Sequence, residues 1–288
     1  MTLTIVSLAL AAALFFGLAL VLTQAGLKHL EPLPGSCIAI SSACAIFVLL
    51  APITVDLSQW HYASAGLFAL IGCLFPATVT ILTFYANRRI GPAVTGALGN
   101  LAPLFAVFIA VLMLGETVSV GQGMAVLVIV AGIILLYRTP RSGALGGIAW
   151  AFALPLAAAF IRGVVQPLVK IGLEDWPNPF AAVTIGYVVS ALVVLISSAA
   201  NRRGWPVPFN RTGWLWFAAV GLCNGLAVLC LYQALGRGPV SLVAPLVACY
   251  PLATLVFGWA FPGGSPLSRQ AVVGIGITVA GVAILLSL

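Results

Sequence analysis

Apolar residues fill this chain in long blocks, separated by short clusters of proline, glycine and charged residues. A helix of about 20 apolar residues is long enough to cross the hydrocarbon core of a bilayer. The pattern therefore predicts ten transmembrane helices, and the shortest connectors require neighbouring helices to run antiparallel. The predicted segments span residues 3–27, 34–55, 62–87, 91–113, 119–137, 144–172, 179–199, 212–236, 238–261 and 267–287.

The second half of the chain repeats features of the first half. Tyr85, Gly91 and Pro92 correspond to Tyr232, Gly238 and Pro239, which lie 147 positions later. Further pairs are Phe16-Gly17 with Arg162-Gly163 (146 apart), Gly66 with Gly213 (147), Pro103-Leu104 with Pro251-Leu252 (148) and Gly132 with Gly281 (149). The offset between matching residues changes slowly along the chain, as expected after a duplication followed by small insertions and deletions. The chain is predicted to hold two five-helix units, residues 1–139 and 140–288.

An odd number of helices in each unit has a physical consequence. The second unit must enter the membrane from the opposite side, so the two units are inverted relative to each other. The expected fold is an all-α polytopic membrane protein, with ten transmembrane helices arranged as two inverted five-helix repeats. Inverted repeats are typical of secondary transporters, whose substrate site lies near the bilayer midplane between the repeats.

Composition excludes several other classes of protein. The chain is 62% hydrophobic and 6% charged, far from the roughly one-quarter charged residues of soluble domains. No basic residue precedes Lys28, so the first apolar run is expected to be a retained helix and not a signal peptide. The six cysteines lie within apolar segments without metal-ligand spacing, so neither a metal nor a cofactor is expected. The net charge of +7 comes from scattered residues at segment ends, which does not indicate nucleic-acid binding.

The basic residues are distributed unequally between the two sides of the membrane. The connectors that follow odd-numbered helices hold Lys28, Arg88, Arg89, Arg138, Arg141, Arg202, Arg203, Arg211 and Arg269. The opposite side holds Arg237, together with Lys170 at the end of the sixth segment. Because cytoplasmic loops carry an excess of Lys and Arg, the odd connectors are expected in the cytoplasm and both termini outside.

The chain resembles the drug/metabolite transporter superfamily, and within it the ten-helix EamA-type proteins. The resemblance covers nearly the full length. It rests on Phe16-Gly17, Tyr85-Ala86, Tyr232-Gln233-Ala234, Pro103, Pro251, Leu114-Gly115-Glu116 and the glycine-rich last helix of each half. Gly263-Gly264 stands where the family usually has Gly-Glu, so any role of Glu116 is not duplicated in the second half. The resemblance implies cytoplasmic termini, which conflicts with the orientation that the charges predict.

No carboxylate lies in the middle of an apolar segment. All five acids lie at segment ends or in connectors, namely Glu31, Asp56, Glu116, Glu174 and Asp175. Proton-coupled cation exporters related to this superfamily usually carry a membrane-embedded glutamate. Its absence argues against antiport of cationic drugs.

Arg162 departs from the placement of charges at segment edges. A central arginine costs about 2.5–3.5 kcal/mol on a translocon scale, so it is expected to face protein or a water-filled cavity. Arg162, Gln166 and Lys170 follow one another at four-residue spacing and form one polar stripe. In the superfamily a lysine often follows the aromatic-Gly pair by seven residues, as Lys170 follows Gly163. The stripe is predicted to bind substrate; the alternative is that Arg162 caps carbonyls freed by Pro155 or reaches the surface with Lys170.

Other polar residues inside apolar segments complete the predicted binding site. They are Gln24, Tyr85, Asn100, Asn224, Tyr232, Gln233 and Tyr250. Interhelical hydrogen bonds are the alternative use of each one. Prolines that remove backbone hydrogen bonds are expected where helices bend around a cavity. These are Pro76, Pro103, Pro155, Pro167, Pro245 and Pro251.

These features favour a permease or exporter of a bacterial-type inner membrane, working by alternating access. Because the stripe is cationic and no acid opposes it, the expected substrates are small amphipathic metabolites such as amino acids or related carboxylates. Efflux of drugs or other metabolites is the alternative, and a membrane enzyme acting on lipid-linked substrates would need a catalytic cluster that the sequence lacks. The expected partners are the small-molecule substrate and the lipid bilayer, and a monomer suffices to form the cavity.

Overall fold

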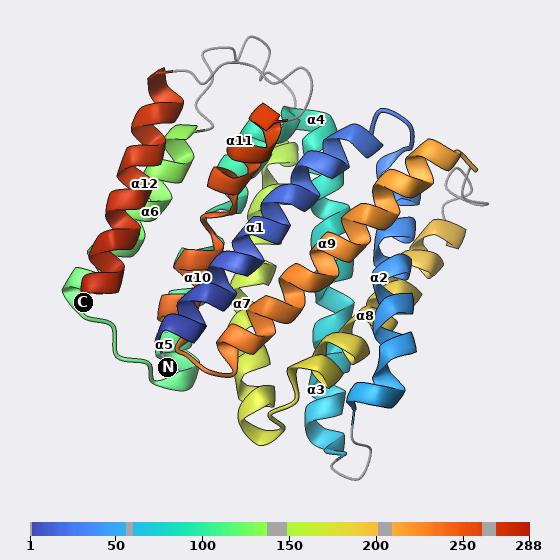
Figure 1. Ribbon diagram of the computed structural model, residues 1–288, viewed down its shortest axis with the longest axis horizontal. Helices are drawn as coiled ribbons and strands as arrows, with labels where there is room; N and C mark the ends of the chain where they lie inside the picture. The colour runs from blue at the N-terminus through green and yellow to red at the C-terminus, as the bar shows by residue number, and fades with distance from the viewer. Residues whose placement is uncertain (1, 56–59, 137–148, 201–208, 261–268) are drawn as a thin grey trace.

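The computed structural model describes residues 2–55, 60–136, 149–200, 209–260 and 269–288, all of which fold into helices and short connectors (Figure 1). The first half contains α1 (Thr2–Gly26), α2 (Pro32–Thr54), α3 (Tyr62–Gly72), the π-helical turn η2 (Cys73–Thr78), α4 (Val79–Gly99), α5 (Ala102–Leu114) and α6 (Val120–Leu136). The second half contains the 3-10 turn η3 (Ala149–Phe152), α7 (Ala153–Asp175), α8 (Pro179–Ala200), α9 (Arg211–Leu235), α10 (Val240–Val247), α11 (Tyr250–Ala260) and α12 (Arg269–Ser287).

These helices account for ten membrane segments in the described part of the chain. Seven helical segments are long and apolar enough to cross a bilayer, and three further apolar helices are shorter. Many large apolar side chains on their outer faces are exposed, as expected where lipid covers them. The predicted all-α membrane fold is confirmed.

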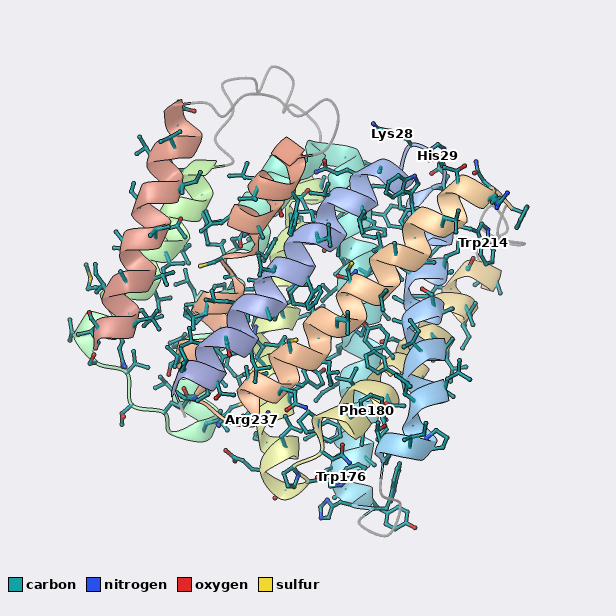
Figure 2. All side chains as sticks on the ribbon, in the orientation of Figure 1. Lys28, His29, Trp176, Phe180, Trp214 and Arg237 are labelled. Atoms are coloured by element: carbon teal, nitrogen blue, oxygen red, sulfur yellow. The ribbon has the colours of Figure 1, made fainter. Side chains whose placement is uncertain are left out.

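The two halves run in opposite directions through the bundle. Both termini lie at one end, and Lys28, which follows α1, lies at the other (Figures 1 and 2). Trp176 follows α7, the helix of the second repeat that corresponds to α1, and lies at the same end of the bundle as the two termini (Figure 2). Helices α1 and α7 are therefore antiparallel, and the predicted inversion of the repeats is confirmed.

Two glycines allow the halves to interlock. A Cβ on Gly17 of α1 would lie 2.6 Å from the Cβ of Ala253 on α11. A Cβ on Gly163 of α7 would lie 3.0 Å from the backbone nitrogen of Ala106 on α5. Each repeat thus packs its first helix closely against the fourth segment of the other repeat. The paired glycines found in the sequence mark these two crossings.

The fourth segment of each half is interrupted near its middle. The chain leaves the helix at Asn100 and Leu101, between α4 and α5, and again at Ala248 and Cys249, between α10 and α11. The two breaks lie 148 positions apart, the same offset that relates Pro103 to Pro251. In the first half, α4 runs through residues 88–90, where the sequence predicted a connector, so that predicted boundary is wrong.

The third segment is broken by a residue with extended backbone geometry. Phe75 has φ −139° and ψ 130° and precedes Pro76 within η2. Ser190 of α8 satisfies backbone groups on both sides of this break. Its hydroxyl donates to the carbonyl oxygen of Gly72 at 2.6 Å and accepts from the backbone nitrogen of Ala77 at 3.3 Å. The bend is therefore held by a neighbouring helix, as irregular backbone inside a membrane requires.

Candidate functional site

A cavity of about 150 Å³ lies between the two halves. Side chains from α1, η2, α4, α5, α7, α8, α9, α10 and α11 line it. Each of the interruptions described above borders it, through Phe75 and Pro76, through Asn100 and Ala102, and through Ala248 and Tyr250. Its position between inverted repeats, at broken helices, is where secondary transporters bind their substrates.

The walls contributed by α1 and α7 differ in chemistry although the two helices are repeat-equivalent. Arg162 and Gln166 line the cavity from α7. The positions 146 earlier on α1 are Phe16 and Leu20, which also line it. Duplication followed by divergence has therefore produced a cavity with a polar wall and an apolar wall.

Arg162 is half-buried and reaches the interrupted region of α4. A Cβ on Gly99 would lie 3.8 Å from Nη1 of Arg162 and 4.0 Å from Oη of Tyr250. Arg162 and Tyr250, both from the second half, therefore converge on the same stretch of first-half backbone. No hydrogen bond or salt bridge of the Arg162 guanidinium is found within the described residues. The charge thus faces the cavity with its donors available.

Three buried polar atoms around the cavity have no hydrogen-bond partner among the described residues. They are Oγ1 of Thr95, Oε1 of Gln166 and Oη of Tyr187. Their residues are only 3%, 8% and 1% exposed, and all three line the cavity. Because buried polar groups are normally paired, these atoms leave hydrogen-bonding capacity unmet beside the cavity.

The structure separates the ten predicted site residues into two groups. Those on the cavity are Arg162, Gln166, Asn100, Asn224 and Tyr250. Those away from it are Gln24, Tyr85, Lys170, Tyr232 and Gln233. Gln24 is exposed, Tyr232 lies in the main hydrophobic core, and Gln233 bonds to Arg237. The sequence did not single out Thr95 and Tyr187.

Lys170 lies away from the cavity and bonds within the second half. Its ammonium group donates to the carbonyl oxygens of Gly238 at 3.1 Å and Leu235 at 3.5 Å, and lies 3.6 Å from a carboxylate oxygen of Glu174. These carbonyls belong to the end of α9 and the turn that follows it. Lys170 thus holds the α9–α10 turn and does not extend the polar stripe into the cavity.

Glu116 joins the two halves at the same end. Its carboxylate accepts hydrogen bonds from the backbone nitrogens of Val240 at 2.7 Å and Ser241 at 2.9 Å. These amides open α10, whose own N-cap residue, Pro239, provides no side-chain cap. A carboxylate from the first half therefore caps a helix of the second half, where the helix dipole favours negative charge.

The cavity extends toward the opposite end. Thr23 lines it only three residues before α1 ends, and Pro155 lines it close to the start of α7. Both helix ends lie at the end marked by Lys28 (Figures 1 and 2). The cavity thus reaches toward the Lys28 end, while Glu116 bonds the two halves together at the other end.

Comparison with known families decides the relationship. The sequence pattern of the EamA-like transporter family matches residues 3–138 and matches again over residues 146–287. The chain belongs to the EamA-like transporter family. EamA-like proteins are membrane transporters of the drug/metabolite type, so the chain is a multi-pass membrane transporter. The predicted unit junction at residues 139–140 lies outside the described residues and stays a prediction.

The EamA fold is also present among solved structures. The crystal structure of another protein superimposes on this chain with a TM-score of 0.81. The superposition covers 98% of this chain and 98% of the other. The two sequences are 18% identical, so the likeness shows the fold alone. No curated protein matches the chain.

Proposed function

We propose that this EamA-like protein is an inner-membrane exporter of small amphipathic carboxylates, amino acids or their relatives, working by alternating access. The observation that carries the proposal is the Arg162 guanidinium, which faces the cavity without a protein counter-charge among the described residues. A buried guanidinium is matched best by a carboxylate, which can accept two parallel hydrogen bonds from it.

The broken helices support an anionic substrate. Helices α5 and α11 both begin at the cavity, where Ala102 and Tyr250 line it. The amino ends of such half-helices carry the positive end of the helix dipole. In transporters with discontinuous helices these ends point at anionic substrate groups. The cavity therefore combines one full positive charge with the amino ends of two half-helices.

The remaining lining favours an amphipathic molecule of small size. Phe16, Leu20, Phe75 and Val228 are among the apolar side chains that line the cavity. The hydrocarbon part of a substrate can pack against these side chains and be shielded from water, which favours binding. A cavity of about 150 Å³ is suited to a small metabolite.

Alternating access fits the arrangement of the two ends. The bonds of Glu116 join the two halves at one end, while the cavity reaches toward the other through Thr23 and Pro155. Rocking one five-helix half against the other would exchange which end is closed. The basic residues predict that the odd connectors are cytoplasmic, so the Glu116 contact would lie on the outer side.

Flux into proteoliposomes tests the proposal. Purified protein should move a radiolabelled small carboxylate across the bilayer faster than protein-free liposomes do, and Arg162→Ala should remove the difference. Transport of lipophilic cations, without transport of any carboxylate in a broad panel, would replace this proposal with multidrug efflux. Hydrolysis or transfer of a lipid-linked compound would point to a membrane enzyme.

A further inference from the structure

We infer that the cavity selects carboxylates that carry an uncharged N–H donor, as in N-acyl amino acids, over free amino acids that carry an ammonium group. The inference rests on the proposed function, because it takes Arg162 as the carboxylate site. It goes further in two ways. It assigns a second polar contact to the substrate, and it states that the substrate is a monoanion.

The first step is the balance of charge in the cavity. Arg162 contributes one positive charge, and no acidic side chain is among the described residues that line the cavity. A bound monoanion neutralises the arginine. A zwitterion would bring a further positive charge into the same low-dielectric space, with no carboxylate of the protein to pair with it. An unpaired charge in such surroundings is strongly disfavoured.

The second step concerns the buried oxygen atoms without partners. Oε1 of Gln166, Oγ1 of Thr95 and Oη of Tyr187 can each accept a hydrogen bond. An uncharged N–H donor satisfies such a neutral acceptor without adding charge. Leaving a buried acceptor unpaired is costly, so a ligand that supplies the donor gains affinity over one that lacks it.

The third step is the position of one of these acceptors relative to Arg162. Gln166 follows Arg162 by four residues, so both side chains lie on the same face of α7, one turn apart. The carboxylate and amide N–H of an N-acyl amino acid are attached to the same carbon. A single small molecule can therefore contact both side chains, while its apolar side chain lies toward Phe16 and Leu20.

Three matched ligands test the inference by calorimetric binding to the purified protein in detergent. N-Acetyl-L-leucine is a monoanion with an amide donor, 4-methylpentanoate is a monoanion without a donor, and L-leucine is a zwitterion. We expect N-acetyl-L-leucine to bind at least tenfold more tightly than either of the others. Equal or tighter binding of L-leucine would overturn the inference and leave the carboxylate proposal standing.

A variant pair assigns the donor contact. Gln166→Leu keeps a side chain of similar size but removes the acceptor, so the affinity for N-acetyl-L-leucine should fall about tenfold relative to that for 4-methylpentanoate. Gln233→Leu, at a position away from the cavity, should change neither affinity. An unchanged preference in Gln166→Leu would overturn the role of Gln166.

Failure of the proposed function gives a different result from failure of this inference. If none of the three carboxylates binds to the wild-type protein and Arg162→Ala changes no flux, the carboxylate site itself is wrong. If 4-methylpentanoate and N-acetyl-L-leucine bind equally and both depend on Arg162, the carboxylate site stands and the amide contact is refuted.

Discussion

At the scale of single residues, Arg162 gives the cavity its charge. Replacing it with alanine should lower transport of a carboxylate by at least tenfold, because hydrogen bonds to charged groups contribute about 1.5–3 kcal/mol. Arg162→Lys should retain part of the activity, since lysine provides a point charge in place of a planar fork. Flux normalised to the amount of folded protein is the measurement.

The matched control for this prediction is Lys170, a second cation on α7 that lies away from the cavity. Lys170→Ala removes the hydrogen bonds to Gly238 and Leu235, so it should lower thermal stability and leave flux per folded molecule nearly normal. The opposite pattern, with poorly folded Arg162→Ala that transports normally per molecule, would assign Arg162 a purely structural role.

The sequence predicts part of the site at this scale, and helix geometry explains the rest. A step of four residues advances the direction of a side chain by about 40° around a helix. Gln166 therefore still faces the cavity with Arg162. Lys170 is turned away from Arg162 by about twice that angle and lies one turn closer to the carboxyl end of α7. Thr95 and Tyr187 were missed because hydroxyls are common in membrane helices, and only their burial without partners distinguishes them.

At the scale of elements, Ser190 supports the break in the third segment. Ser190→Ala would leave the carbonyl of Gly72 and the amide of Ala77 unpaired in a buried position. We expect a loss of about 1–3 kcal/mol in the free energy of unfolding. Ser197→Ala on the same helix is the control, since Ser197 bonds only within α8. Thermal unfolding in detergent compares the two, and equal melting temperatures would contradict the supporting role.

The cap of α10 is a second device that joins elements distant in sequence. Glu116→Gln removes the negative charge that faces the Val240 and Ser241 amides. Loss of a helix cap costs about 0.5–2 kcal/mol, so the melting temperature should fall. Glu174→Gln, which weakens an exposed ion pair, should have a much smaller effect. A Glu116 variant as stable as its control would refute the cap.

Helix positions follow from the sequence more readily than helix interruptions. Long apolar blocks identify the membrane segments because their length is set by the bilayer. Pro103 and Pro251 indicate that the fourth and ninth segments bend, but proline is also compatible with the first turn of a helix. Here α5 and α11 begin next to these prolines, so the chain breaks just before them.

At the scale of the whole molecule, the duplication allowed the inverted architecture to be predicted from one sequence. Matching pairs such as Gly17 and Gly163 proved to mark equivalent crossings between the halves. The chemical difference between the cavity walls formed by α1 and α7 was harder to predict. It depends on which face of α1 and of α7 turns toward the cavity, and that is decided by packing against α11 and α5.

The orientation of the molecule is the last prediction, and it needs no knowledge of the substrate. Both termini lie at the end opposite Lys28 (Figures 1 and 2), and the basic residues concentrate at the end of Lys28. By the positive-inside rule, that end is predicted to be cytoplasmic. A cysteine added at the C-terminus should therefore react with an impermeant thiol reagent in intact spheroplasts.

A cysteine introduced beside Arg138 should react only after the membrane is permeabilised. The wild-type protein is the control, since its six cysteines lie in apolar segments and should not react with a reagent that stays in water. Labelling in the reverse order would place the termini in the cytoplasm. The fold would be unaffected, but the Lys28 end would then face outward, and the Glu116 contact would lie on the cytoplasmic side.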